Sequence, residues 1–109
     1  LTQTIMALAN QTAAWLGIDK KIESEDILVN DAYCQAGYGI LQPAEVEAIR
    51  LFARTEGILL DPVYTGRAAA GLIDLIRKGF FSPDETVLFW HTGGIPALFA
   101  EPYASALRG

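Results

Sequence analysis

Two short segments of this 109-residue chain place hydroxyl groups and glycines directly after an apolar run. Ile58–Leu60 leads into the segment Asp61–Arg67, and Thr86–Trp90 leads into His91–Gly94. An apolar run that ends in such residues before a helix is typical of a β-strand that delivers its last side chains to a ligand crevice. Glycines also let backbone N–H groups approach an anion at a helix N-terminus. The two segments therefore predict a ligand site at the ends of strands.

The candidate residues of these segments also have plainer interpretations. The ring of Tyr64 could pack on the end of the following helix with its hydroxyl in solvent. Thr65 could simply be a helix N-cap, and Arg67 a surface residue of the first helical turn. Tyr38 is more suggestive of a site, because the glycines at positions 37 and 39 leave its ring room in a crevice.

The residues that could bind a metal or act as nucleophiles are few. His91 is the only histidine, and a lone histidine at a strand end is more often a hydrogen-bonded structural residue than a catalyst. Cys34 is the only cysteine and is expected to be packed rather than nucleophilic, because no basic residue lies near it in sequence. Glu45, Glu47 and Asp74 are predicted to be solvated charges on helix faces. We expect no metal site.

Composition excludes several classes of function. A net charge of −5 argues against nucleic acid, whose phosphates need a basic surface. Half of the residues are hydrophobic, at 51%, yet no apolar run approaches the ~20 residues of a membrane span. A single cysteine favours a reducing compartment, so we expect the cytoplasm. Leu1 already lies within a helical pattern without an initiator Met, and we expect the chain to be part of a longer protein.

The pattern along the chain alternates helix and strand. Apolar spacing predicts helices over residues 1–16, from Pro43 to Gly57, and from about Gly66 to Lys78. Strands are predicted at 26–30, 58–60 and 86–90. This alternation indicates an α/β fold, a small parallel sheet with flanking helices. So small a sheet would leave open edges, and we expect the rest of it in chain outside this sequence.

Two long segments resemble a known family. Arg54–Ala68 and His91–Phe99, together with Gly37–Gly39, resemble the C-terminal part of D-cysteine desulfhydrases. Those enzymes belong with 1-aminocyclopropane-1-carboxylate (ACC) deaminases in the fold-type II, tryptophan-synthase-β-like group of pyridoxal-phosphate enzymes. The resemblance spans nearly the whole chain. It implies that residues 1–109 contribute to the large cofactor-binding domain of a three-layer αβα enzyme that is a cytoplasmic homodimer.

The resemblance also implies roles for individual residues. Tyr38 and Tyr64 match two active-site tyrosines that approach the amino and thiol side of the substrate. Thr65 and Thr92 match positions beside the pyridine ring of pyridoxal 5'-phosphate, with Gly93 at the same cofactor-binding turn. ACC deaminases usually carry Glu at the first threonine position and Leu at the second. Two neutral threonines favour elimination from a substrate with a good leaving group over the opening of a cyclopropane ring.

The implied reaction is β-elimination, which converts D-cysteine and water to pyruvate, hydrogen sulfide and ammonia. The lysine that binds the cofactor and the phosphate-binding loop lie N-terminal to this segment in the family, and Lys20, Lys21 and Lys78 do not match that lysine. We therefore expect the chain alone to be inactive. The alternatives are an ACC deaminase, another sulfur-amino-acid lyase such as an L-cysteate sulfo-lyase, and a non-catalytic α/β ligand-binding or subunit-interaction domain.

Overall fold

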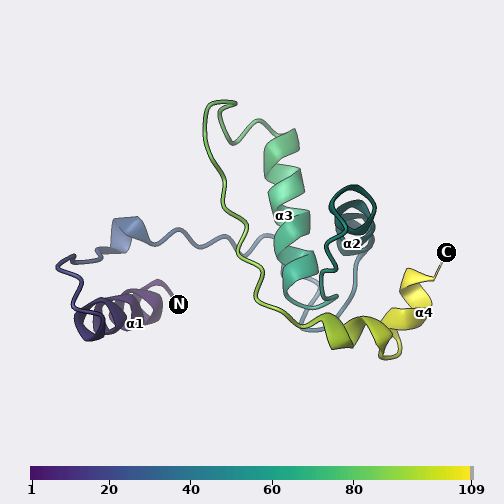
Figure 1. The fold of residues 1–109 in the computed structure, drawn as a ribbon, viewed down its shortest axis with the longest axis horizontal. Helices are drawn as coiled ribbons and strands as arrows, with labels where there is room; N and C mark the ends of the chain where they lie inside the picture. Colours follow the sequence, from purple (N-terminus) through teal and green to yellow (C-terminus); the bar gives the residue numbers. More distant parts are fainter. Residues whose placement is uncertain (109) are drawn as a thin grey trace. The chain divides into compact units, whose positions relative to one another are not determined.

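A computed structural model describes residues 1–108, and the chain divides after Asp31 into two compact units. No boundary is evident in the sequence at this point. Within the described residues the secondary structure is helical, and no β-strand is assigned (Figure 1). The strands predicted at 26–30, 58–60 and 86–90, and the parallel sheet they would form, are therefore not seen within residues 1–108. A strand exists only by pairing with a neighbour, and these short apolar runs do not pair with one another.

The first unit, residues 1–31, consists of α1 (Thr2–Trp15) and the short 3₁₀ helix η1 (Ser24–Asp26). α1 confirms the first predicted helix. The side chain of Asn10 joins the two elements: its amide nitrogen donates to the Ile22 carbonyl (2.8 Å), and its oxygen accepts from the Ile22 N–H (2.9 Å). Ala13 is the one residue of α1 that is buried. Most of the apolar side of α1 is thus left exposed.

The second unit begins at Ala32 and is built on two helices, α2 (Pro43–Glu56) and α3 (Thr65–Arg77). Both confirm the predicted helices to within a residue or two. α2 starts with Pro at its first position, where the missing N–H costs no hydrogen bond, and ends at Gly57 in a left-handed C-cap. Beyond α3 follow the 3₁₀ helix η2 (Ile95–Phe99) and the short α4 (Tyr103–Leu107).

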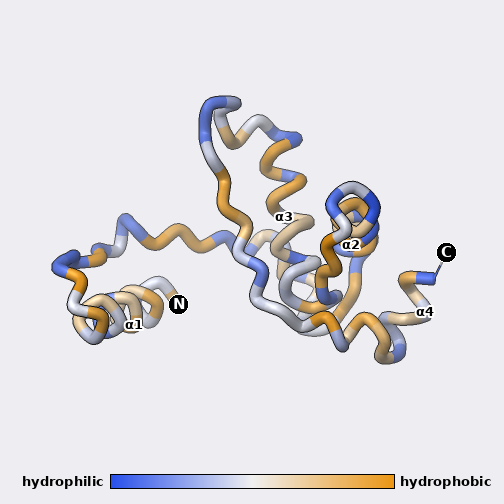
Figure 2. The backbone as a smooth tube through the Cα atoms, in the orientation of Figure 1, coloured by the Kyte–Doolittle hydropathy of each residue, from blue (hydrophilic) through white to orange (hydrophobic). Residues whose placement is uncertain are grey.

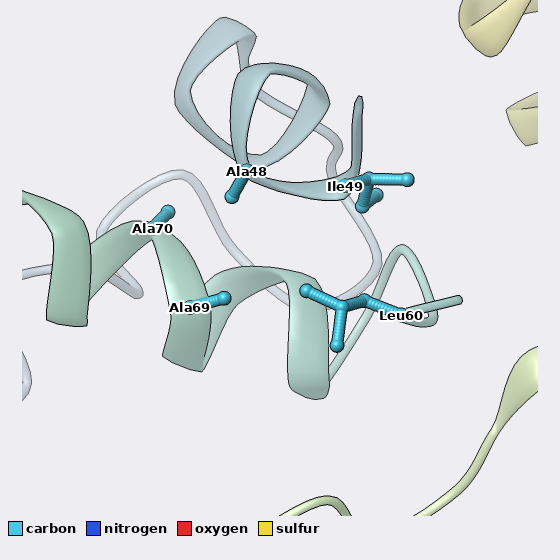
Figure 3. Close-up of a cluster of buried hydrophobic side chains, with 5 residues drawn as sticks. All are labelled: Ala48, Ile49, Leu60, Ala69 and Ala70. Carbon is cyan, nitrogen blue, oxygen red and sulfur yellow. The ribbon is translucent and has the colours of Figure 1, made fainter. Parts of the chain in front are cut away.

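The core of the second unit lies between α2 and α3 (Figure 3). Small alanines on both helices let the backbones approach closely. The buried residues are Ala48, Ile49, Leu60, Ala69 and Ala70. Phe89, from the run predicted as the last strand, packs on the same core with its ring centroid 5.5 Å from that of Phe52. This segment thus contributes one side chain to a helical core instead of pairing in a sheet.

Many other apolar side chains are exposed, including Leu28, Leu88 and Trp90 in the segments predicted as strands. Figure 2 shows apolar residues along the connecting segments as well as on the helices. None of the helices in residues 1–108 has the length and apolar character that a bilayer crossing demands.

Candidate functional site

The turn Asp61–Thr65, called here the Asp61 turn, fixes the start of α3. The carboxylate of Asp61 accepts four hydrogen bonds: from the N–H groups of Val63 (2.7 Å), Tyr64 (2.7 Å) and Thr65 (2.6 Å), and from the Thr65 hydroxyl (2.7 Å). The backbone N–H of Asp61 donates to the same hydroxyl (2.8 Å). Asp61 and Thr65 are both buried. Asp61 thereby satisfies N–H groups that the helix start would otherwise leave unpaired.

These hydrogen bonds keep Asp61 charged. Burial by itself raises the pKa of the carboxyl group, but the hydrogen bonds from Thr65, Tyr64 and Val63 outweigh it, so the pKa lies below its usual value. A carboxylate has about four acceptor positions, and all four are occupied. Asp61 is therefore a structural anion with no position left for a ligand.

Thr65 is the first residue of α3 and not its N-cap, so the plainer interpretation of this residue is wrong. Its single hydroxyl proton is donated to Asp61, and one lone pair accepts from the Asp61 N–H. The hydroxyl retains one acceptor position. Thr65 can thus accept a hydrogen bond from a ligand in this arrangement but cannot donate one.

The turn His91–Gly94 lies against the Asp61 turn, so the structure brings the two predicted segments together. A Cβ placed on Gly94, which has φ +90°, would lie 2.8 Å from the Cβ of Asp61. The Nε2 of His91 lies 2.9 Å from the Leu59 carbonyl oxygen, and its Nδ1 accepts from the Gly93 N–H (3.0 Å). With Nδ1 as acceptor, Nε2 is the donor to Leu59, so His91 is hydrogen-bonded through both ring nitrogens, as predicted for a structural residue.

Thr92 and Gly93 form the open side of this turn. Thr92 is exposed, and no atom outside the immediate chain neighbours lies within 4 Å of the position of a Cβ on Gly93. Thr65 and Thr92, predicted to flank one ring, thus belong to turns in contact through Gly94 and Asp61. Only Thr92 presents a hydroxyl that Asp61 does not hold.

Tyr38 and Tyr64 meet, as predicted for a shared site. Their hydroxyl oxygens are 2.5 Å apart and their ring centroids 6.0 Å, in an edge-on arrangement with an interplanar angle of 63°. The two residues are 78% and 58% exposed. We call them the tyrosine pair. The hydroxyl of Tyr64 is thus hydrogen-bonded to Tyr38, although the residue remains exposed.

The tyrosine pair has an unexpected electrostatic property. Proton relay by a tyrosine requires neighbours that lower its pKa, but the hydrogen bond to Tyr38 raises the pKa of Tyr64, and the nearby charge of Asp61 adds to this. Tyr64 is therefore protonated at neutral pH. Its hydroxyl therefore carries a proton that it can donate.

Arg67 is a site residue that sequence reasoning missed. Its guanidinium donates to the Glu45 carboxylate (2.9 Å) and to the carbonyls of Gly37 (3.1 Å) and Ile40 (2.8 Å), on either side of Tyr38. The Arg67 and Glu45 side chains are only 13% and 4% exposed. The predictions of a surface Arg67 and a solvated Glu45 are both wrong, because the packing of α3 on α2 pairs these charges.

The remaining charged candidates are peripheral. Glu47 pairs with Arg77, and both are exposed. Asp74 is partly exposed and binds Lys78, which confirms its position on a helix surface. Cys34 is exposed, so the prediction that it is packed is wrong. No cluster of His, Cys, Asp and Glu that could hold a metal occurs in the described part of the chain.

Known proteins match this chain over most of its length. The family described as "Pyridoxal-phosphate dependent enzyme" matches residues 2–93. A 1-aminocyclopropane-1-carboxylate deaminase of Methylobacterium nodulans is 42% identical over 94 residues, which cover 86% of this chain and 28% of the relative. Proteins with the same name from Burkholderia vietnamiensis (41% over 106 residues; 97% and 31%) and Pseudomonas syringae pv. tomato (40% over 98 residues; 90% and 29%) are similar.

The described residues fit part of a pyridoxal-phosphate site. Thr92, Gly93 and the tyrosine pair present open hydroxyls and backbone that suit an uncharged ring and a substrate. These groups include neither an amine for the aldehyde nor a cation for the phosphate, and Arg67 at the start of α3 is bound to Glu45. The chain spans under a third of the length of these relatives. By its match over residues 2–93, the chain belongs to the family of pyridoxal-phosphate dependent enzymes.

Proposed function

We propose that the complete protein carrying this sequence is a pyridoxal-phosphate-dependent D-cysteine desulfhydrase, a carbon–sulfur lyase with a three-layer αβα fold. The family match and the resemblance of its two long segments to D-cysteine desulfhydrases support this proposal. Residues 1–109 would form part of its large domain. The cytoplasmic location and the homodimer that the resemblance implies stay predictions.

The observation that carries the proposal is the absence of a free carboxylate on the Asp61 turn. Position 65 holds a neutral hydroxyl, and the adjacent anion, Asp61, has every acceptor position filled. A carboxylate beside a pyridine nitrogen would keep it protonated and the electron sink strong, as the opening of a cyclopropane requires. A neutral hydroxyl suffices when sulfide, a good leaving group, departs.

The tyrosine pair supplies the chemistry at the leaving group. Pyridoxal phosphate, when bound, provides the electron sink that stabilises negative charge on the substrate α-carbon. At the leaving group, one tyrosine hydroxyl would hydrogen-bond the departing sulfur and donate a proton to it as the electron pair of the C–S bond passes to sulfur. Of the two hydroxyl protons, one is used between Tyr38 and Tyr64 and the other is free to face the substrate.

A second candidate is an ACC deaminase, because the relatives reported above carry that name. This activity would need the same cofactor and the same tyrosine pair. It differs in requiring a protonated pyridine nitrogen, and the neutral hydroxyl of Thr65 supplies no negative charge to keep that nitrogen protonated.

Product analysis of the complete protein with added cofactor tests the proposal. We expect sulfide and pyruvate from D-cysteine, little 2-oxobutyrate from ACC, and no sulfite from L-cysteate. Tyr64→Phe should lower kcat by about 10²-fold or more with the cofactor absorbance retained. Tyr33→Phe is the matched control, because its hydroxyl binds Asp74 away from the tyrosine pair and its loss should leave turnover unchanged.

Other products would identify the alternatives. Rapid 2-oxobutyrate release from ACC without sulfide would establish the deaminase. A protein that binds no cofactor and releases none of these products would fit the non-catalytic ligand-binding or interaction domain.

A further inference from the structure

Arg67 holds the loop that carries Tyr38. From the contacts of this side chain we infer that Arg67 and Glu45, called here the Arg67 clamp, position Tyr38 against Tyr64 for the reaction. The inference rests on the proposed function for its catalytic consequence, but the positioning itself is a property of the fold. Neither residue of the clamp contacts the tyrosine hydroxyls, so both are positioning residues.

The three acceptors of Arg67 surround the loop. Nη1 donates to the Gly37 carbonyl before Tyr38, and Nη2 donates to the Ile40 carbonyl after it (3.1 and 2.8 Å). Nε donates to Glu45 Oε1 (2.9 Å). The planar guanidinium has fixed donor directions, so it holds the carbonyls in one geometry. A lysine ammonium has no such fork.

Glu45 fixes the guanidinium to α2. Its second carboxylate oxygen accepts from the Gln42 N–H (2.9 Å) at the start of that helix, just after the Tyr38 loop. The pair is nearly buried, and a buried charge without its partner is strongly destabilising. Arg67 and Glu45 therefore act as one unit.

Tyr38 itself has little else to hold it. Its side chain is exposed, and its ring contacts Tyr64. Its neighbours Gly37 and Gly39 have φ of +103° and +71°, a backbone region that other residues adopt with strain. Besides the clamp, the Tyr103 hydroxyl donates to the Gly39 carbonyl (2.8 Å). The place of Tyr38 therefore depends on hydrogen bonds to the backbone of the residues around it, Gly37, Gly39 and Ile40.

This arrangement fixes the positions of both tyrosines relative to one helix, α3. Tyr64 precedes α3 directly and Arg67 lies in the first turn of α3, so the Asp61 turn orients the two together. The start of α3 thus carries one tyrosine and the group that places the other. A small displacement of a reacting group can cost about 10²-fold in rate.

The test uses the complete protein with its cofactor and three variants, Arg67→Ala, Arg67→Lys and Glu45→Gln. Arg77→Ala is the matched control, because Arg77 also links α3 to a glutamate of α2, Glu47, but in an exposed pair far along the helix. Each tyrosine is labelled with ¹³C at Cζ, and its NMR chemical shift is followed as the pH is raised. The Tyr64 signal is assigned by its loss in Tyr64→Phe.

We expect the Tyr64 signal to titrate above the ordinary value of about 10 in the unaltered protein and in Arg77→Ala. It should move down toward that value in Arg67→Ala, and partly in Arg67→Lys and Glu45→Gln, because Tyr38 is released from Tyr64. With D-cysteine, kcat should fall on the order of 10²-fold in Arg67→Ala, with a smaller change in KM and the cofactor absorbance retained.

The two readouts separate the possible failures. If the unaltered protein makes no sulfide while the Tyr64 titration responds to the clamp variants, the proposed function is wrong and the positioning stands. If Arg67→Lys and Glu45→Gln fold but leave the Tyr64 titration where it is, the clamp does not position Tyr38. The last conclusion does not depend on Arg67→Ala, so it survives if that variant fails to fold.

Discussion

At the scale of single residues, the hydroxyl of Thr65 and the carboxylate of Asp61 decide what the site can offer. Each oxygen of Asp61 accepts two hydrogen bonds, and the proton of Thr65 is one of the donors. This pairing fixes the start of α3 and leaves the Asp61 carboxylate no acceptor position for a ligand. Two substitutions test these two consequences.

Asp61→Asn should lower the free energy of unfolding of the chain by about 1.5–3 kcal/mol at pH 7. The side-chain amide carries no charge, and its NH₂ group would face the N–H and hydroxyl donors that now bind the carboxylate. The pKa of Asp61 is lowered on folding, so its contribution is present above the unfolded value of about 3.9 and is lost as the pH falls through the folded value. Urea unfolding at pH 7 and pH 3 should therefore show a smaller difference in acid. Asp84→Asn, in an exposed turn, is the control and should change stability by less than about 0.5 kcal/mol at either pH.

Thr65→Glu combined with Thr92→Leu should shift the complete protein from sulfide release toward ACC deamination. The glutamate places an anion where the ring nitrogen is expected, and the leucine removes the competing hydroxyl. The structure adds a cost, since the new carboxylate lies beside Asp61 and breaks two hydrogen bonds. Thr65→Ser keeps both bonds and should keep D-cysteine turnover. Full sulfide production by the double variant, without ACC deamination, would show that these threonines do not flank the ring.

At the scale of elements, the site depends on contact between two turns. The Gly93–Gly94 backbone rests on the Asp61 turn, and His91 joins it to Leu59. Both glycines have positive φ, but their surroundings differ: Gly94 touches the Asp61 side chain, whereas Gly93 faces open space. Substitutions at these two glycines therefore distinguish the cost of backbone strain, which both share, from the cost of a clash with Asp61, which only Gly94 has.

Gly93→Ala and Gly94→Ala should both destabilise the chain, each by roughly 1–2 kcal/mol for a left-handed residue with a side chain. Gly94→Ala should cost about 1–3 kcal/mol more, because its methyl group would overlap Asp61 and separate the two turns. Urea unfolding measured by circular dichroism gives the comparison. Equal losses in the two variants would mean that the turns are not in contact in solution.

At the scale of the whole molecule, many large apolar side chains are exposed, whereas few apolar residues are buried. Large side chains such as Trp15, Leu28, Leu88 and Phe99 are exposed in both units. Large apolar side chains exposed in such number are expected to be covered by a partner or by other chain.

We therefore expect the chain alone to self-associate. Light scattering behind a sizing column should give a mass above the 11.8 kDa of one copy, and the mass should rise with concentration. A single copy at all concentrations, with no binding of an apolar dye, would contradict this expectation.

We also expect the chain alone to release no sulfide from D-cysteine with added pyridoxal phosphate and to form no visible absorbance band with it. Hydrogen bonds to Glu23 and Asp74 raise the pKa values of Lys21 and Lys78 and keep these amines protonated, which opposes their reaction with an aldehyde. Mixing the chain with D-cysteine and cofactor, followed by a sulfide assay, checks this. Sulfide release would show that the catalytic groups lie within these 109 residues.

The sequence by itself predicted the three longer helices and carried the family resemblance. Local patterns suffice for these, because helical periodicity, Pro43 at a helix start and glycine after a helix end act over one or two turns. The same patterns failed for the strands, since pairing requires a neighbour that no local pattern supplies. Tertiary structure alone decided the roles of Arg67 and Glu45. Their charges lie 22 positions apart, and only the packing of α3 on α2 removes both from water and makes each the other's partner.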